Sequence, residues 1–322
     1  MLDAARGCLI GLAVGDALGQ PTEGWTPAAI QAKWGYLEGF VGDAAVSDDT
    51  EYTLFSAKVL LEHGLGVTSD DFADEWLAYI VSVPGPFKGA GFSEMAAIEN
   101  LRRGLRPPLS GQHYHSWSDG LAMRVAPFGV VFPAQPEAAC QLARLDGVVS
   151  HAGEGIYGGL AVAAAVSVAM AEASLEEIVD AALRAVPFDS WTAREIRRAL
   201  DIVEPLDSAR NAIQPLHDAL AVAYYPWTDL APEAVALAFG LLVAGREDFR
   251  ETLLAAVNLG RDADTVAAIA GAILGAKLGY AGIPEAWRDA IGPATGRCLA
   301  CVCGMSLHTV AVELVALARN AE

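Results

Sequence analysis

Two short segments of the chain place oxygen-bearing side chains directly before apolar stretches. The first is Ser47-Asp-Asp-Thr50, which precedes a predicted helix over residues 51–62. The second ends in Asp262-Ala-Asp-Thr265 and precedes an Ala-rich predicted helix over residues 266–279. Hard divalent cations such as Mg²⁺ and Mn²⁺ bind carboxylate and hydroxyl oxygens. We therefore expect the two segments to hold one or two Mg²⁺ or Mn²⁺ ions through Ser47, Asp48, Asp49, Asp262, Asp264 and Thr265.

Helix capping is the ordinary alternative for each segment, because Ser, Thr and Asp are preferred residue types at helix N-termini. Asp264 and Thr265 are good N-cap types for the second helix. One cap needs only one side chain, however, and three consecutive oxygen side chains exceed that need. A cation at a helix N-terminus also needs enough negative charge to outweigh the helix dipole. The repeated pattern therefore favours metal binding over capping.

Two further carboxylates belong to the first forty residues. Glu23 follows a Gly-rich predicted helix over residues 2–18, whose glycines Gly7, Gly11 and Gly15 form a flat stripe for close approach of a helix or a ligand. A lone loop glutamate such as Glu23 is ordinarily a solvated side chain, although a carboxyl group can also act as an acid or base in catalysis. Asp16, near the end of the same helix, either orients a neighbouring loop or holds the ligands or the waters of a metal ion through hydrogen bonds.

Four motifs in chain order resemble the ADP-ribosylglycohydrolase family. They are Gly11-Leu-Ala-Val-Gly-Asp-Ala-Leu-Gly19 with Glu23, Ser47-Asp-Asp-Thr50, Ser118-Asp-Gly-Leu-Ala-Met-Arg124, and Gly260-Arg-Asp-Ala-Asp-Thr265 with the helix after it. The resemblance covers most of the chain. It implies an all-α fold, a compact orthogonal multi-helix bundle, and a dinuclear Mg²⁺ or Mn²⁺ centre.

The resemblance also implies roles for individual residues. It makes Glu23, Asp49 and Asp262 the catalytic carboxylates, and it places Ser118, Asp119 and Gly120 in a substrate-binding loop. Three further residues are candidates for substrate contact, and each has another reading. His151 contacts substrate, positions a metal-bound aspartate or caps a buried helix; Tyr157 stacks on substrate or packs in the core; Arg261 binds substrate or narrows the pocket.

Three residues depart from the pattern of the family. Ser47 replaces threonine and keeps the hydroxyl, Asp119 stands where asparagine is common, and Arg261 replaces a usual glycine. A carboxylate at Asp119 repels a diphosphate unless Arg261 or a metal compensates. The leading prediction is hydrolysis of the ribose C1″ N- or O-glycosidic bond of an ADP-ribosyl group on a protein side chain or small molecule. The alternatives are a smaller nucleoside or other glycoside as substrate, and a non-catalytic binding protein on the same scaffold.

Composition limits the remaining possibilities. The chain has 322 residues, of which 53% are hydrophobic, and we expect one domain over residues 1–322. A net charge of −19 argues against non-specific nucleic-acid binding, which needs a basic face. We expect a cytoplasmic protein without a membrane span, because no signal-peptide pattern is visible and the longest uncharged run, over residues 155–171, is Ala/Gly-rich. Cys298, Cys301 and Cys303 are expected in a buried helix rather than at zinc.

Overall fold

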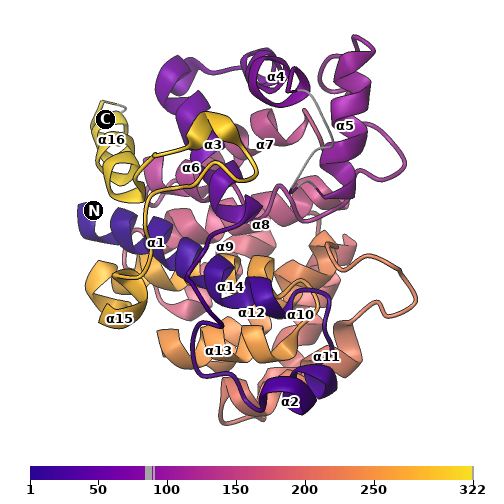
Figure 1. Cartoon of the computed structure of the whole chain (residues 1–322), viewed down its shortest axis with the longest axis vertical. Coiled ribbons are helices and arrows are strands. Elements are labelled where there is room, and N and C mark those ends of the chain that lie inside the picture. The colour runs from indigo at the N-terminus through magenta and orange to yellow at the C-terminus, as the bar shows by residue number, and fades with distance from the viewer. Residues whose placement is uncertain (84–88, 90, 321–322) are drawn as a thin grey trace.

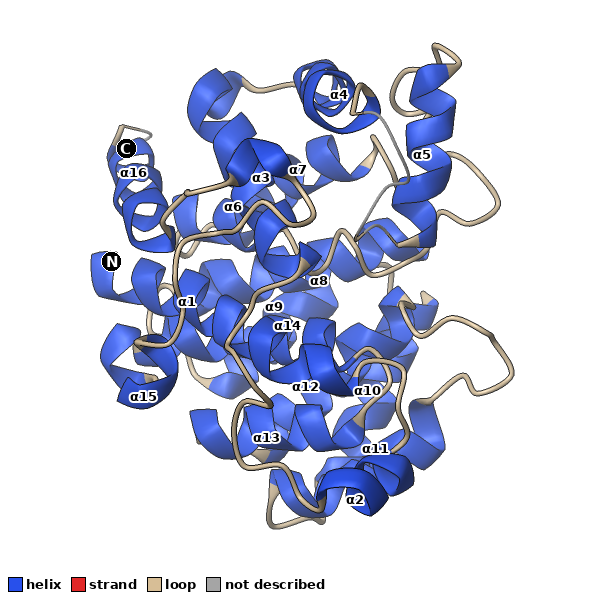
Figure 2. Ribbon diagram, in the orientation of Figure 1, coloured by secondary structure: helices blue, strands red, loops and turns tan. Residues whose placement is uncertain are grey.

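The protein folds into helices joined by turns and loops (Figure 1). The computed structural model describes residues 1–83, 89 and 91–320. Over these residues no β-strand forms, and only an isolated bridge joins Ser118 to Leu230 (Figure 2). The all-α prediction is therefore confirmed. The helices are α1 Leu2–Gly19, α2 Pro27–Trp34, α3 Asp48–His63, α4 Ser69–Trp76, α5 Phe92–Arg102, α6 Ala126–Val131, α7 Pro136–Gly147, α8 Glu154–Ala169, α9 Leu175–Arg184, α10 Trp191–Val203, α11 Ala209–Leu220, α12 Ala231–Ala244, α13 Phe249–Leu259, α14 Ala263–Leu278, α15 Glu285–Arg288 and α16 Leu307–Arg319.

Helix α14 lies in the interior and packs against α1, α8, α12 and α13. Every residue of α14 from Ala263 to Ala276 is buried. Its sequence is mostly Ala, Gly and Ile, so it forms a helix with no polar face, as expected for an element surrounded by others. The first turn of this buried helix carries Asp264 and Thr265, which places the second predicted metal segment in the interior.

Helix α1 contacts α14 backbone to backbone along the predicted glycine stripe. A Cβ atom on Gly11 would lie 2.2 Å from the carbonyl oxygen of Gly271, and one on Gly271 would lie 2.1 Å from that of Gly11. Gly15 faces Ala267 in the same way, at 2.1 Å. Only glycine permits helices to approach this closely. The two helices run antiparallel, so the end of α1, with Asp16, adjoins the start of α14.

Several element boundaries differ from those predicted. Helices α3 and α14 each begin three residues earlier than expected, at Asp48 and Ala263. Four of the predicted metal ligands therefore lie in first helical turns, and Ser47 and Asp262 are the N-cap residues. The prediction of a buried helix for the segment with Cys298, Cys301 and Cys303 is wrong. The segment forms a loop with one 3₁₀ turn over Ala300–Val302, because buried Glu51 accepts hydrogen bonds from backbone N–H groups of this segment and holds it outside a helix. The long uncharged run forms α8 as predicted.

None of the helices in the described ranges is both long and apolar enough to cross a membrane.

Substitution of Gly11 tests the backbone contact. A Gly-to-Ala change inside a helix ordinarily stabilises a protein by roughly 0.5–1 kcal/mol. At Gly11 the sign reverses, because the new methyl group would overlap the Gly271 carbonyl and push the helices apart. We expect Gly11→Ala to lower the free energy of unfolding in urea by about 1–3 kcal/mol or more.

Gly292→Ala is the matched control, since a Cβ atom at Gly292 meets no atom within 4 Å. The control should change the free energy of unfolding by less than about 0.5 kcal/mol. Equal stability of Gly11→Ala and the control would contradict the packing described above.

Candidate metal centre

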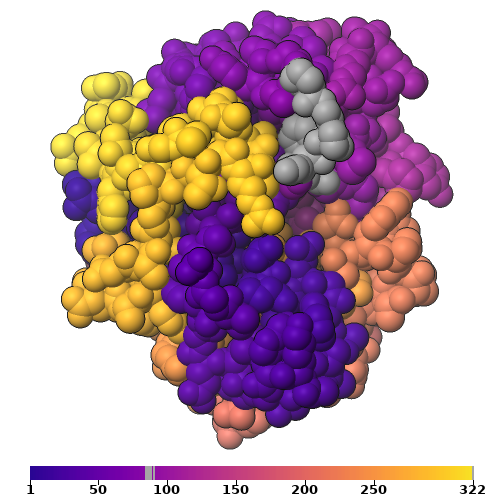
Figure 3. Space-filling model, in the orientation of Figure 1, coloured from indigo at the N-terminus to yellow at the C-terminus, as the bar shows by residue number. Residues whose placement is uncertain are grey.

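An acidic cavity opens where the ends of several helices meet. Its volume is about 450 Å³. In the space-filling view, the N-terminal segment in indigo and the salmon-to-orange segment from the later half of the chain border each other on the visible face (Figure 3). The described lining contains seven carboxyl side chains and no Lys or Arg side chain. The carboxyl groups belong to Glu23, Asp48, Asp49, Asp119, Asp229, Asp262 and Asp264.

The two predicted metal segments occupy equivalent positions on their helices. Asp49 and Asp264 are each the second residue of a helix, and a threonine follows each of them. The N-cap residues, Ser47 and Asp262, make no side-chain cap hydrogen bond. The Thr265 hydroxyl instead donates to Asp49 Oδ1 at 3.0 Å, across 216 residues of sequence. Capping therefore does not account for these side chains, and a hydrogen bond joins the two segments.

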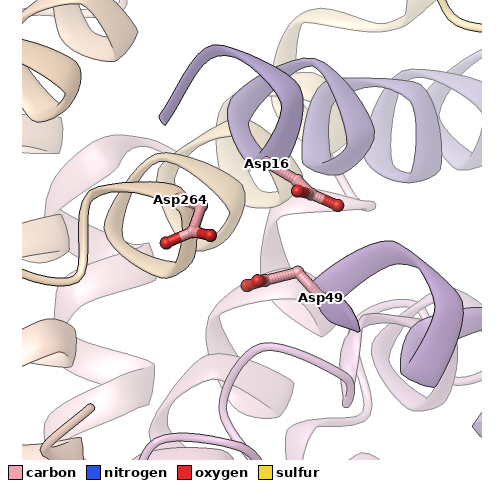
Figure 4. A group of neighbouring side chains, drawn as sticks. All are labelled: Asp16, Asp49 and Asp264. Atoms are coloured by element: carbon pink, nitrogen blue, oxygen red, sulfur yellow. The ribbon is translucent and has the colours of Figure 1, made fainter. Parts of the chain in front are cut away.

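Asp16 holds the first segment in place. One of its oxygens accepts the Ser47 N–H at 2.9 Å and the Thr50 N–H at 3.1 Å, and the other accepts the Ser47 hydroxyl at 2.7 Å. The carboxyl groups of Asp16, Asp49 and Asp264 face one another between three helices (Figure 4). One oxygen from each of them lies within 4.8 Å of the others. Asp16 thus orients the loop before α3 and also belongs to the carboxylate cluster.

Glu23 joins the cluster from the cavity rim. A second group of ligand atoms within 4.8 Å of one another comes from Glu23, Asp262 and Asp264. The Glu23 loop is fixed to the second segment, since Gly24 N–H donates to the Arg261 carbonyl at 2.7 Å and Arg261 N–H donates to the Trp25 carbonyl at 2.9 Å. A Cβ atom at Gly260 would lie 2.2 Å from the Trp25 carbonyl oxygen, so glycine is required for this contact.

The cluster carries an unfavourable concentration of negative charge. Burial raises the pKa of Asp49 and of Asp264 well above the usual aspartate value, and neighbouring carboxylates raise each further. Burial, followed by repulsion from Asp16, raises the pKa of Asp48 to about 7. Glu23 is exposed to solvent, yet partial desolvation by the cavity wall and repulsion from Asp262 raise its pKa to about 7. Repulsion of this kind is relieved by a bound cation.

The donor set fits a divalent cation. Among the predicted ligands, the buried Asp264 Oδ1 has no hydrogen-bond partner in the described part of the chain. Buried charges in proteins are normally paired or coordinate a metal. Carboxylate and hydroxyl oxygens are the ligands that Mg²⁺ and Mn²⁺ prefer. Five of the six predicted ligands line the cavity, and the sixth, Ser47, donates its hydroxyl to Asp16 instead.

The predicted substrate-binding residues separate into two sets. Asp119 and Gly120 line the cavity. Ser118 and His151 lie behind it: the Ser118 hydroxyl is 3.1 Å from His151 Nε2, and His151 is 1% exposed. Burial lowers the pKa of His151 well below its usual value. Tyr157 is half-buried and packs against the hydrophobic core.

Arg261 is bound to a buried carboxylate outside the described lining of the cavity. Its Nε and Nη2 atoms donate to the two oxygens of Glu233 at 2.6 and 3.0 Å. Its backbone has φ of 61°, in the left-handed region where glycine is most easily accommodated. This geometry explains why a glycine would suit the position for backbone reasons. The Arg261 guanidinium is used by Glu233 and is not available to offset Asp119.

Two lining side chains that can bind or react, Trp227 and Asp229, were not predicted as site residues. Trp227 ends the aromatic run Tyr224-Tyr-Pro-Trp227 and Asp229 follows it, in the loop between α11 and α12. A carboxylate two residues after a tryptophan in a loop was the available signal, but one sequence does not show that this loop reaches the cavity.

Comparisons of the sequence and of the structure with known proteins point to the same family. The model of the family described as ADP-ribosylglycohydrolase matches residues 1–320. An uncharacterized protein of Archaeoglobus fulgidus is 34% identical over 300 residues, which cover 90% of this chain and 92% of that protein. The human ADP-ribosylhydrolase ARH3 is 24% identical, over 89% of both chains. A solved structure titled ADP-ribosylglycohydrolase-related protein complex aligns with a TM-score of 0.68 and 26% identity, over 98% of each chain.

The raised carboxyl pKa values predict how the stability of the metal-free protein depends on pH. A carboxyl group whose pKa is higher in the folded state binds more protons when folded, so its contribution is fully present below the unfolded value near 4 and is lost as pH rises through about 7. In EDTA we expect the Tm to be lower at pH 8 than at pH 5. Added Mn²⁺ should raise the Tm more at pH 8 than at pH 5.

The Asp48→Asn variant should show a smaller fall in Tm between these pH values, because one repelling charge is removed. Asp201→Asn is the matched control, since Asp201 is exposed on α10. A wild-type Tm in EDTA that rises from pH 5 to pH 8, measured by thermal denaturation, would contradict the electrostatic description of the cluster.

Proposed function

The chain belongs to the ADP-ribosylglycohydrolase family, and on this basis we propose that it is a divalent-metal-dependent hydrolase of ribose C1″ glycosidic bonds. The family supports hydrolysis of glycosidic bonds in ADP-ribosylated substrates. The bond cleaved here joins ribose C1″ to a nitrogen or oxygen of a protein side chain or small molecule. The observation that carries the proposal is the buried cluster of carboxylates whose oxygens converge without a balancing cation among the described lining residues.

We assign the metal ligands to the first turns of α3 and α14. Asp48, Asp49, Asp262, Asp264 and the Thr265 hydroxyl line the cavity and would hold one or two Mg²⁺ or Mn²⁺ ions. Bound ions of this kind polarise substrate oxygens and lower the pKa of a coordinated water. Asp16 and Ser47 lie next to these ligands. The hydrogen bonds from Ser47 to Asp16 fix the loop before α3 and so position Asp48 and Asp49.

The chain's own residues supply proton transfer and positioning. Hydrolysis forms a bond between a water oxygen and C1″, breaks the bond from C1″ to the leaving atom, and gives that atom a proton. Glu23 is exposed at the rim and close to Asp262 and Asp264, so it can exchange a proton with a substrate bound in the cavity. The carboxylates of Asp49 and Asp262 can accept hydrogen bonds from the attacking water and from ribose hydroxyls.

A smaller glycoside is the second candidate substrate, and one observation favours it. Asp119 lines the cavity, and the Arg261 guanidinium that would offset its charge is bound to Glu233. A diphosphate placed near Asp119 therefore needs compensation from another source. A nucleoside without phosphate does not. Assays on ADP-ribosylated peptides and on free nucleosides, each with Mg²⁺, Mn²⁺ or EDTA, separate the two substrates.

Two substitutions separate metal binding from proton transfer. Asp264→Asn should abolish Mn²⁺ binding, measured by calorimetry, and reduce metal-dependent hydrolysis by about 10²-fold or more, because a buried ligand loses its charge. Glu23→Gln should leave Mn²⁺ binding in place while lowering kcat by about 10²- to 10⁴-fold, the usual contribution of general acid–base catalysis. Circular dichroism should show unchanged helix content in both variants.

Asp201→Asn again serves as the control and should retain wild-type kcat and Mn²⁺ affinity. Full metal-dependent activity in Asp264→Asn would show that the metal ligands have been assigned incorrectly. Loss of Mn²⁺ binding in Glu23→Gln, with the fold intact, would make Glu23 a ligand and remove its proposed role in proton transfer.

A further inference from the structure

One wall of the cavity carries carboxylates on elements other than α3 and α14. Asp119 lies in the loop before α6, and Trp227 and Asp229 lie in the loop between α11 and α12. The two loops are joined, since Asp119 N–H donates to the Asp229 carbonyl at 3.3 Å and an isolated bridge pairs Ser118 with Leu230. This wall is therefore one connected surface, distinct from the two metal-binding turns.

Trp227 presents a supported aromatic ring to the cavity. It stacks on Phe92 with ring centroids 5.1 Å apart and an interplanar angle of 27°. Trp227 is 41% exposed, although it is among the large apolar side chains that usually lie in the core. Phe92 also contacts the rings of Trp117 and Tyr225, so the stack is held from several sides. An exposed, rigidly held ring at a cavity wall is a surface on which a planar group can stack.

Asp229 is fixed beside this ring. Its Oδ2 accepts the Phe92 N–H at 3.2 Å, at the start of α5. No hydrogen bond or ion pair to its other oxygen occurs among the described residues. Asp119 is 2% exposed, and its Oδ2 has no partner in the same part of the chain. Two carboxylates in the cavity thus keep an oxygen for hydrogen-bond donors that the described chain does not supply.

We propose that Trp227, Asp229 and Asp119 form a subsite for the leaving group, and that it takes a planar, nitrogen-linked group bearing N–H donors. This inference rests on the hydrolysis proposed above. A guanidinium or amino-bearing ring stacks on an aromatic face and donates N–H bonds to carboxylates. A serine-type leaving group is an aliphatic oxygen, which offers no plane and leaves both carboxylates unpaired.

The position of the subsite suits a leaving group rather than a distant part of the substrate. Asp229 lines the same cavity as Asp262 and Glu23. The subsite therefore adjoins the carboxylates assigned to cleavage at C1″. Two substrates share the required chemistry, namely an arginine guanidinium linked to ADP-ribose and an amino-bearing nucleobase linked to ribose.

The test compares three substrates with Mn²⁺ present: an ADP-ribosyl-arginine peptide, an ADP-ribosyl-serine peptide and cytidine. Asp229→Asn removes the charge and keeps an amide oxygen for the Phe92 N–H, so the start of α5 is preserved. We expect this variant to lose about 10- to 100-fold in kcat/KM for the nitrogen-linked substrate that the wild type prefers, and less than about 3-fold for the serine peptide.

Matched variants isolate each interaction. Asp229→Glu should restore part of the lost kcat/KM because it restores the charge. Trp227→Phe should retain most of the wild-type kcat/KM for this substrate, because it keeps an aromatic face. Trp227→Leu should lose it. Asp201→Asn should leave kcat/KM unchanged for all three substrates. Equal loss on nitrogen-linked and serine substrates in Asp229→Asn, or unchanged rates on all of them, would overturn the subsite.

Binding measurements keep this test separate from the hydrolysis proposal. If the wild-type protein cleaves none of the three substrates with Mg²⁺ or Mn²⁺, the proposed hydrolysis fails. Calorimetry with N-acetylarginine amide and with cytidine then decides the subsite alone. The subsite predicts binding of one of them that weakens about 10-fold or more in Asp229→Asn. Absence of binding of both to the wild type, or equal binding to wild type and variant, would overturn it.

Discussion

Backbone contact between α1 and α14 determines where the carboxylates of the cavity lie. Gly11 and Gly271 approach so closely that neither position accepts a Cβ atom without displacement of a helix. Because the two helices are antiparallel, this contact places Asp16 beside Asp264. Asp16 then fixes the start of α3 through Ser47 and Thr50. Residues from three distant segments of the sequence are in this way brought to one place by main-chain packing.

The assembled cluster is costly by itself. Buried carboxylates repel one another, and their pKa values are raised. The N-termini of α3 and α14 partly offset the negative charge through their dipoles, but the buried Asp264 Oδ1 remains without a partner in the described chain. A divalent cation resolves both problems, since it neutralises charge and accepts oxygen ligands. The stability of the fold and the proposed chemistry therefore depend on the same set of side chains.

Much of this arrangement could be predicted from the sequence. The glycine spacing indicated close helix contact, and the repeated Asp-Thr pattern indicated a shared metal site. The family resemblance supplied Glu23, which as a lone loop glutamate has no distinctive pattern. Other contacts between distant segments could not be predicted. The ion pair of Arg261 with Glu233, the burial of His151 and the position of Asp229 in the cavity all depend on loop packing that one sequence does not encode in any local pattern.

We propose that the first turns of α3 and α14, with their N-cap residues, form one metal centre. Anomalous diffraction from crystals grown with Mn²⁺ tests it most directly, because the scattering locates the ion independently of any assay. We expect one or two anomalous peaks in the cavity, in contact with carboxylate oxygens of Asp49, Asp262 and Asp264. Peaks that lie only elsewhere, or an empty cavity at saturating Mn²⁺, would contradict it.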